Sequence, residues 1–310
     1  MTKVAIIGGA GTLGSSAAFN IAVQGLADEI VLIDIRQNVA THHAADIQTA
    51  IVGRQNTVVR AGIDEDLAGS DIVIMAAGTT PRLISSRMEY LSENIPIILR
   101  VKEKIELCCP SAIVITTANP ADILNYALYK RSTLERQKLI GYTLNDTLRF
   151  CQAIAEALKI KSTEVDAMVI GEHGDNQVLL FSSIKVDGKP FPVDEDFKRD
   201  IRARVPNLLR EYKALKAGRT SGWTSGVGLA KIVHAIVNDT KEVLPCSVVL
   251  AGEYGYTGLS MSVPAIIGRG GIHQIFDYEL VSDEKEQLEN SVNIIKSGIR
   301  HLEEVLGSEG

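Results

Sequence analysis

The segment that most constrains the fold is a glycine-rich turn near the N-terminus. Residues 9–14 read GAGTLG and match the pattern G-x-G-x-x-G. The turn directly follows an expected strand at Val4–Ile7 and opens an expected helix at Ser15–Gln24. In this setting the glycines let the backbone turn tightly and approach a pyrophosphate, which the helix N-terminus attracts. Backbone geometry alone would explain an isolated Gly-rich turn, but the strand–turn–helix context predicts a dinucleotide site.

A carboxylate closes the second expected strand. Asp34 follows Ile30–Ile33 and lies 20 residues after Gly14, where a carboxylate accepts hydrogen bonds from the adenosine ribose hydroxyls. Its charge repels a 2′-phosphate, so the sequence favours NAD over NADP, although Arg36 nearby would weaken that preference. The candidate cofactor contacts in this part of the chain are Gly8, Gly9, Gly11, Thr12, Leu13, Gly14, Asp34 and Gly78.

Strands and helices alternate through the first half of the chain. Strands are expected at Val4–Ile7, Ile30–Ile33, Thr57–Arg60, Ile72–Met75 and Ile113–Thr116, and helices at Ser15–Gln24, Val39–Ile51, Arg87–Leu107 and Ala121–Lys130. The strands are apolar along nearly their whole length, as in a parallel sheet covered on both faces. The pattern predicts an α/β fold with a Rossmann-type doubly wound parallel sheet.

The pattern changes after about residue 145. Helices are expected at Asp146–Lys159, Asp194–Leu215, Trp223–Val237 and Asp283–Val305, and strands at Ala167–Ile170, Val178–Val186, Ser247–Ala251 and Leu259–Ile267. This order predicts a dinucleotide-binding domain at residues 1–143 and an α+β substrate domain at residues 144–310. No linker-like stretch separates the two parts, so we expect them to pack closely.

Composition excludes several classes of function. The 310 residues carry 32 basic and 38 acidic side chains, a net charge of −6, which gives no electrostatic reason to bind nucleic acid or a membrane surface. No run of 18 apolar residues occurs, and the N-terminus resembles a strand more than a signal peptide, so we expect a cytoplasmic protein. The four cysteines show no C-x-x-C spacing, which predicts reduced thiols and no metal site.

One histidine of the six lies in a setting typical of a functional site. His173 lies in the segment IGEHGDN, within a Gly-flanked turn after an expected strand, whereas His42 and His43 lie on a polar helix face. A histidine suits reversible proton transfer near neutral pH, which the oxidation of a secondary alcohol requires. A single turn histidine is equally explained by backbone hydrogen bonds, so this residue needs support from elsewhere in the chain.

That support comes from a carboxylate and a guanidinium three residues apart. Asp146 and Arg149 project from one face of an expected helix. An N-cap Asp with a solvated Arg would explain the pair structurally. The functional interpretation is that Asp146 orients His173 and stabilises its protonated form, while Arg149 binds a substrate carboxylate through a bidentate contact.

Two loops follow strands at the edge of the sheet where ligands bind. Residues 77–87 (AGTTPRLISSR) carry Arg82 and Arg87, and their closure over an anionic substrate would exclude water and polarise a carbonyl. Asn119 lies in the segment TANP after the fifth expected strand. An amide at that strand end can hydrogen-bond the reacting oxygen.

Taken together, these segments resemble the lactate/malate dehydrogenase superfamily over nearly the whole chain. The matching pieces, in order, are GGAGTLG, VLIDI, AG-x8-R, Asn94, ANPAD, DTLRF, GEHGD and SVPAIIGRGG. The resemblance implies an NAD-dependent 2-hydroxy acid dehydrogenase that works as a homodimer or homotetramer. It implies the following site residues: His173 as acid/base, Asp146 as its partner, Arg149 on the substrate carboxylate, Arg87 on the carbonyl, Asn119 in substrate orientation and in cofactor binding, Asn94 in cofactor binding near the nicotinamide, and Ser221 at the substrate pocket.

The chain departs from the family pattern in the loop that selects the substrate. In the family, the residue six positions before the loop arginine is an Arg for dicarboxylates such as malate and a Gln for lactate. Here that position is Pro81, and Arg82 follows. A shift of one residue gives Arg82 the dicarboxylate-binding role and predicts malate/oxaloacetate as the substrate pair. Without the shift the pocket is less basic and suits lactate or another 2-hydroxy acid.

Two other classes are weighed against this interpretation. The segment Tyr126–Lys130 has the Tyr-x-x-x-Lys spacing of short-chain dehydrogenases and sugar-nucleotide epimerases, but that spacing is frequent on helices and leaves Asp146, Arg149 and His173 unexplained. A non-catalytic NAD-binding protein would not need every one of these reactive residue types. Oxidation of NADH by 2-oxo acids distinguishes the three classes.

Overall fold

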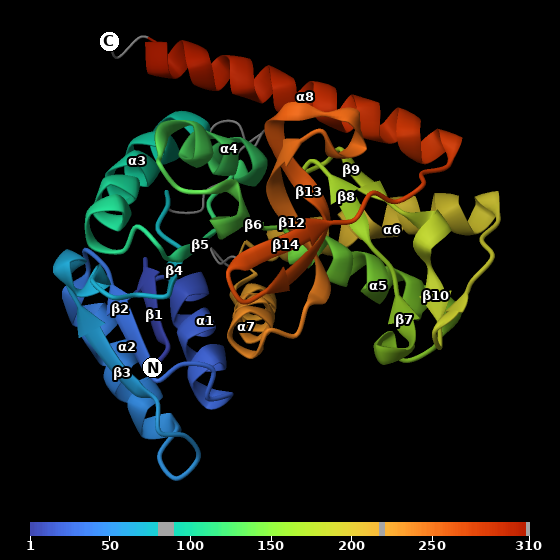
Figure 1. Ribbon diagram of the computed structural model, residues 1–310. Coiled ribbons are helices and arrows are strands. Elements are labelled where there is room, and N and C mark those ends of the chain that lie inside the picture. Colours follow the sequence, from blue (N-terminus) through green and yellow to red (C-terminus); the bar gives the residue numbers. More distant parts are fainter. Residues whose placement is uncertain (80–89, 217–220, 308–310) are drawn as a thin grey trace.

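One sheet runs through both halves of the chain (Figure 1). The computed structural model describes residues 1–79, 90–216 and 221–307, and within these ranges eleven strands join this sheet. Six parallel strands have the order β3-β2-β1-β4-β5-β6. They are β1 (Lys3–Ile7), β2 (Glu29–Ile33), β3 (Val58–Gly62), β4 (Ile72–Met75), β5 (Ile113–Thr116) and β6 (Leu139–Tyr142). The predicted Rossmann-type doubly wound sheet is confirmed.

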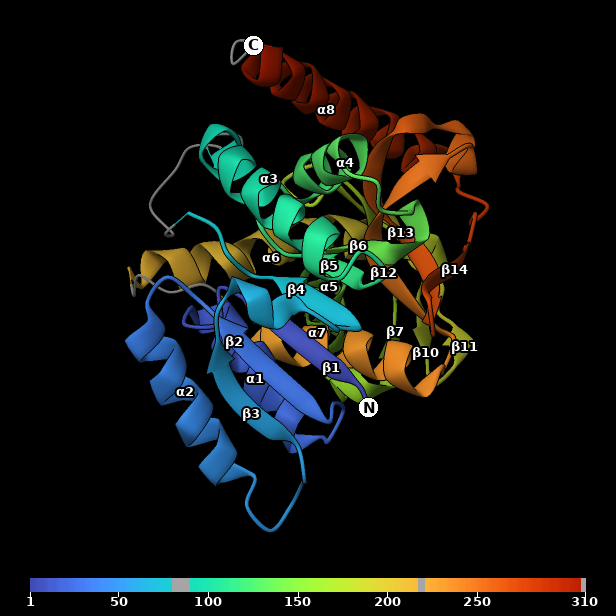
Figure 2. The ribbon, with the colours of Figure 1, turned by 60° about the vertical axis from the view of Figure 1, so that its left-hand side comes forward.

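Helices cover both faces of the parallel strands. They are α1 (Thr12–Val23), α2 (Gln37–Ala50), α3 (Leu91–Cys108) and α4 (Ala121–Arg131). The helices α1 and α2 lie on one face, and α3 and α4 lie together on the other (Figures 1 and 2). All four were expected from the sequence, with ends that differ by a few residues. The strand β6 was not expected, because a four-residue apolar run directly after a charged stretch gives little periodic signal.

The sheet continues into the C-terminal half through an antiparallel pair. The strand β12 (Glu242–Ala251) pairs with β6 and with β13 (Thr257–Gly268). Beyond β13 lie β8 (Val169–Gly171) and β9 (Gln177–Leu179), and β14 (Gly271–Ile275) also pairs with β13. A separate small sheet contains β7 (Val165–Asp166), β10 (Lys185–Val186) and β11 (Lys189–Pro190). The two halves are therefore joined by backbone hydrogen bonds as well as by side-chain packing.

In the described part of the C-terminal half, four helices complete the fold. They are α5 (Leu144–Leu158), α6 (Glu195–Ala214), α7 (Gly222–Asn238) and α8 (Ser282–Gly307). The long helix α8 runs along one side of the molecule, over α4 and the ends of the antiparallel strands (Figure 1). The helix α7 packs against α1, where the small residues Gly222 and Gly226 allow close approach to Thr12 and Ser16. This helix pair brings the C-terminal half against the glycine-rich turn.

The predicted continuous strand at Val178–Val186 is wrong. The strand β9 ends at Leu179, a short 3-10 turn spans Phe181–Ser183, and β10 begins at Lys185. The turn directs the Phe181 ring into a second apolar core, where it meets Phe150 edge-on with 5.3 Å between the ring centroids. Burial of this ring, about 1.5–3 kcal/mol, outweighs the β-propensity of the segment.

Candidate functional site

The glycine-rich turn is packed too tightly for any larger side chain. Gly8 has φ +89°, and a Cβ there would lie 2.5 Å from the Ala77 backbone nitrogen. A Cβ on Gly14 would lie 2.3 Å from the Gly8 carbonyl oxygen. The backbone N–H groups of Gly8 and Gly9 both donate to the Ile33 carbonyl, at 2.8 and 3.2 Å. The turn is thus held between the ends of β2 and β4, at the carboxyl edge of the sheet.

The first turn of α1 is the part of this structure that fits a pyrophosphate. The helix begins at Thr12, followed by Leu13, and its extended N-cap residue, Gly11, has no side chain that could bond the first N–H groups of the helix. Backbone N–H groups at such an N-terminus suit an anionic ligand. Gly222 of α7 packs directly on Thr12, since a Cβ at Gly222 would meet the Thr12 methyl at 2.5 Å. The geometry fits the predicted cofactor.

The Asp34 side chain accepts hydrogen bonds from the backbone of the glycine-rich turn and of Arg36. One carboxylate oxygen accepts from the Ala10 backbone N–H at 3.0 Å, and the other accepts from the Arg36 N–H at 2.9 Å. Only 7 % of the side chain is exposed. These bonds hold the middle of the glycine-rich segment against the end of β2. The contact with an adenosine ribose stays a prediction.

An amide side chain connects the ends of β4 and β5. The Asn94 Oδ1 atom accepts from the Thr79 backbone N–H at 2.8 Å, and Asn94 Nδ2 donates to the Asn119 carbonyl at 2.7 Å. A Cβ on Gly78 would lie 3.3 Å from Asn94 Oδ1. Within the described residues, the buried Oδ1 of Asn119 has no hydrogen-bond partner. An unpaired buried acceptor is unfavourable in a finished core, so its presence fits a site that a ligand completes.

The residues predicted to be catalytic come together. His173 Nδ1 lies 2.5 Å from Asp146 Oδ2, although the two residues are 27 positions apart. The other oxygen, Oδ1, accepts from Arg149 at 3.1 Å. A second Arg149 nitrogen donates to Ser221 Oγ at 3.4 Å. Four residues from three segments thus form one continuous series of polar contacts.

These side chains are largely shielded from water, which determines what they can do chemically. The side chains of Asp146, His173 and Arg149 are 7, 11 and 14 % exposed, respectively. A carboxylate at Nδ1 fixes the imidazole tautomer and makes Nε2 the nitrogen that exchanges a proton with a substrate. The Arg149 guanidinium beside it can pair with a carboxylate in a site of low water content. The arrangement can therefore move a proton to or from an anionic substrate.

The turn that carries His173 is held by two neighbouring backbone bonds. The His173 N–H donates to Asp122 Oδ2 at 2.6 Å, and the Glu172 N–H donates to Ser291 Oγ at 2.5 Å. Sequence reasoning missed Asp122, although it lies in the quoted segment ANPAD. Burial raises the pKa of its carboxyl to about 7, because the desolvation of the charge outweighs the hydrogen bonds that it accepts.

Two predicted residues cannot be placed. Arg82 and Arg87 lie outside the described residues, as does Pro81. Their contact with substrate stays a prediction from the sequence. In the described ranges, no group of three or more His, Cys, Asp or Glu side chains is arranged to hold a metal ion. No helix there is long and apolar enough to cross a membrane.

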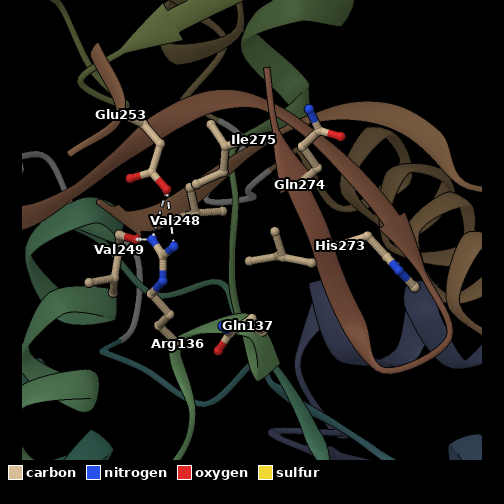
Figure 3. Close-up of a pocket in the computed structure, with 9 residues that line it drawn as sticks. Arg136, Gln137, Val248, Val249, Glu253, His273, Gln274 and Ile275 are labelled. Atoms are coloured by element: carbon tan, nitrogen blue, oxygen red, sulfur yellow. Dashed lines mark hydrogen bonds and ion pairs between the residues drawn. The ribbon is translucent and has the colours of Figure 1, made fainter. Parts of the chain in front are cut away.

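A cavity elsewhere in the molecule is unrelated to these residues. It encloses about 270 Å³ beside β14, and none of the predicted site residues lines it (Figure 3). At its edge Arg136 forms two 3.0 Å contacts with Glu253 and a third with the Val249 carbonyl. These contacts occupy the guanidinium as a structural link between β12 and the turn after it, and we assign no ligand to this cavity.

Comparison with known proteins gives a consistent answer. Residues 2–141 match the model of the lactate/malate dehydrogenase NAD binding domain, and residues 143–306 match the alpha/beta C-terminal domain of the same family. A malate dehydrogenase of Natronomonas pharaonis is 37% identical over 294 residues, which are 94% of this chain and 96% of the relative. An L-lactate dehydrogenase 2 of Lactococcus lactis subsp. lactis is 32% identical over 310 residues, with 97% and 98% covered.

Solved structures agree with the sequence comparison. The apo malate dehydrogenase of Picrophilus torridus superposes with a TM-score of 0.91 at 28% identity, covering 100% of this chain and 99% of that one. The lactate dehydrogenase of Cryptosporidium parvum, solved with lactic acid and NAD, gives 0.90 at 30% identity, covering 97% and 98%. Since both halves of the chain match, the chain belongs to the lactate/malate dehydrogenase family and is an NAD-dependent 2-hydroxy acid dehydrogenase.

Proposed function

We propose that the chain interconverts malate and oxaloacetate, with His173 as the acid/base. The proposed reaction rests on the series of contacts from His173 through Asp146 to Arg149. The unpaired Asn119 oxygen, nearby in the fold, supports it. Relatives named malate dehydrogenase, at 34–37% identity, favour malate. Arg82 in the substrate loop supplies the second positive charge that a dicarboxylate needs. The alternative is lactate, which relatives at 31–32% identity act on by name.

Each residue has a defined part in the proposed mechanism. Arg149 binds the substrate carboxylate, Asn119 orients the reacting oxygen, and the guanidinium of Arg87 polarises that oxygen. His173 Nε2 takes the hydroxyl proton, and Asp146 stabilises the imidazolium that forms. NAD, held by the glycine-rich turn at residues 8–14, would supply the hydride acceptor. In the reverse direction the protonated His173 returns the proton.

Substrate preference is tested by comparing Arg82→Gln with the parent protein. We expect kcat/KM for oxaloacetate to fall about 10–100-fold, as for the loss of one charge-assisted hydrogen bond, while kcat/KM for pyruvate changes little. Arg87→Gln is the matched control, because it should lower the rate with every 2-oxo acid. A parent protein that prefers pyruvate would refute the malate assignment, and an Arg82→Gln variant that keeps its oxaloacetate rate would refute the role of Arg82.

We also propose that the protein is a homodimer or homotetramer working in the cytoplasm. Trp223 and Val227, one turn apart on α7, are 78 and 55 % exposed, and Phe19 on the neighbouring α1 is 38 % exposed. An apolar group of this kind suits contact with a second copy of the chain. The molar mass by light scattering should exceed 33.5 kDa at least twofold and fall toward it in Trp223→Glu. A monomeric parent protein would contradict the proposal.

We further propose that residues 1–143 bind the cofactor and residues 144–310 carry the substrate groups. The glycine-rich turn and Asp34 belong to the first range, and His173, Asp146 and Arg149 to the second. Arg82, Arg87 and Asn119 are the exceptions, since they belong to the first range and have proposed roles toward the substrate. The boundary follows the end of β6 at Tyr142.

A further inference from the structure

We propose that Asp122 is a positioning residue that holds the His173 turn at a fixed distance from the strand end that carries Asn119. The inference rests on the proposed role of His173 and adds a residue to it. Asp122 has no contact with substrate in this proposal. It acts through the backbone of the catalytic turn.

The contacts of Asp122 connect two parts of the proposed active site. Its Oδ2 atom accepts from the His173 backbone N–H at 2.6 Å, across 51 positions of sequence. Its Oδ1 atom accepts from Ser247 Oγ at 2.5 Å, across 125 positions. The residue is 3 % exposed. One carboxylate from the cofactor half therefore hydrogen-bonds the backbone of the proposed acid/base in the substrate half.

Because of where Asp122 lies in the fold, its hydrogen bond to the His173 turn fixes the distance between that turn and Asn119. It lies in the first turn of α4, three residues after Asn119, and α4 packs on β12 and β13. The Asn119 carbonyl is in turn fixed by Asn94 at 2.7 Å. The unpaired Asn119 oxygen and the His173 backbone are thus tied to one short segment. A substrate whose oxygen contacts both residues needs that spacing held to a fraction of an ångström.

A carboxylate is an unfavourable choice for a purely structural role at this position. Burial raises its pKa to about 7, which shows that the charge is poorly solvated there. The surrounding polar groups already bond one another: Asn125 Nδ2 donates to Ser260 Oγ at 3.0 Å, and the Ser247 and Ser260 hydroxyls lie 2.9 Å apart. Those bonds hold α4 to β12 and β13 without Asp122. What the carboxylate adds is the bond to the His173 turn.

The experiment compares Asp122→Ala and Asp122→Asn with Glu284→Ala. In Asp122→Ala the turn loses its contact, and we expect kcat to fall about 10–100-fold while KM for the 2-oxo acid and the affinity for NADH, measured by fluorescence titration, change less than about threefold. Asp122→Asn should recover most of kcat. Its amide oxygen can accept from the His173 N–H while its nitrogen donates to Ser247 Oγ. If Asp122→Ala does not fold, Asp122→Ser replaces it, because its hydroxyl is too short to reach the turn.

Glu284→Ala controls for the loss of a buried carboxylate. Glu284 on α8 is 1 % exposed and accepts from the Ser182 backbone N–H at 2.9 Å, and among the described residues none of its hydrogen bonds reaches the His173 turn. This variant should lower Tm and leave kcat of the folded fraction unchanged. An Asp122→Ala variant with parental kcat, or an Asp122→Asn variant as slow as alanine, would overturn the inference. A parent protein inactive toward every 2-oxo acid would instead refute the proposed function, so the two failures are distinguishable.

Discussion

The glycine-rich turn is proposed to bind the cofactor and the His173 turn to transfer the proton. The two turns are held in place by different kinds of contact. The first is held within one strand–helix–strand unit, because its backbone N–H groups donate to Ile33 and Asp34 at the end of the next strand, 24 or 25 positions on. The second is held by three separate elements: Asp122 of α4, Asp146 of α5 and Ser291 of α8, which lie 51, 27 and, counted from Glu172, 119 positions from their partners. A locally built site can be recognised in a sequence by its pattern, whereas a site built from distant contacts becomes visible only when the chain is folded.

The largest effect is expected at the turn that depends on distant contacts. His173→Ala should lower kcat about 10²–10⁴-fold, because it removes the group proposed to accept the hydroxyl proton. Binding of NADH should change little, since the glycine-rich turn is supported by its own neighbours. Steady-state kinetics with oxaloacetate and a fluorescence titration with NADH measure the two quantities. Comparable turnover in the variant would rule out His173 as the acid/base, and a large loss of NADH affinity would show that the two turns are not independent.

The outcome of the sequence predictions follows the same division. Five of the six parallel strands and the helices between them were predicted, because each is marked in its own sequence by an apolar run or a helical period. The strand β6 and the break after Leu179 were not, since the first is stabilised by pairing with β5 and β12 and the second by the burial of Phe181 against Phe150. The pairing of His173 with Asp146 agreed with the prediction, but it was inferred from resemblance and residue type. Asp122 was missed because its two partners lie 51 and 125 positions away.

A smaller effect is expected from crowding the glycine-rich turn. In Gly14→Ala the new methyl group would lie 2.3 Å from the Gly8 carbonyl, so the turn must open. We expect NADH affinity to fall about 10–100-fold, corresponding to about 1–3 kcal/mol of overpacking strain. The kcat at saturating NADH should stay within about threefold of the parent value, because the His173 turn has separate supports.

Gly53→Ala is the matched control for that change. Gly53 lies in the loop between α2 and β3, and a Cβ there meets nothing within 4 Å. Its φ of +74° makes alanine unfavourable by about 1 kcal/mol, so the control lowers stability without touching the turn. Equal losses of NADH affinity in the two variants would mean that general stability, and not the fit of the turn, determines cofactor binding.

The smallest effect is expected at Asp34. Its carboxylate supports the glycine-rich turn, and its negative charge is expected to exclude a 2′-phosphate. In Asp34→Asn the amide oxygen can still accept from the Ala10 N–H, so the turn keeps its support while the negative charge is lost. Asp34→Ser loses both, because its hydroxyl is too short to reach Ala10. If the charge alone excludes a 2′-phosphate, both variants should narrow the preference for NADH over NADPH about tenfold, and only the serine variant should also weaken NADH. Equal NADH affinities in the two variants would show that the bond to Ala10 contributes little. An unchanged preference in both would assign cofactor selection to another residue, and Arg36, paired with Asp34 at 3.6 Å, is the next side chain to replace.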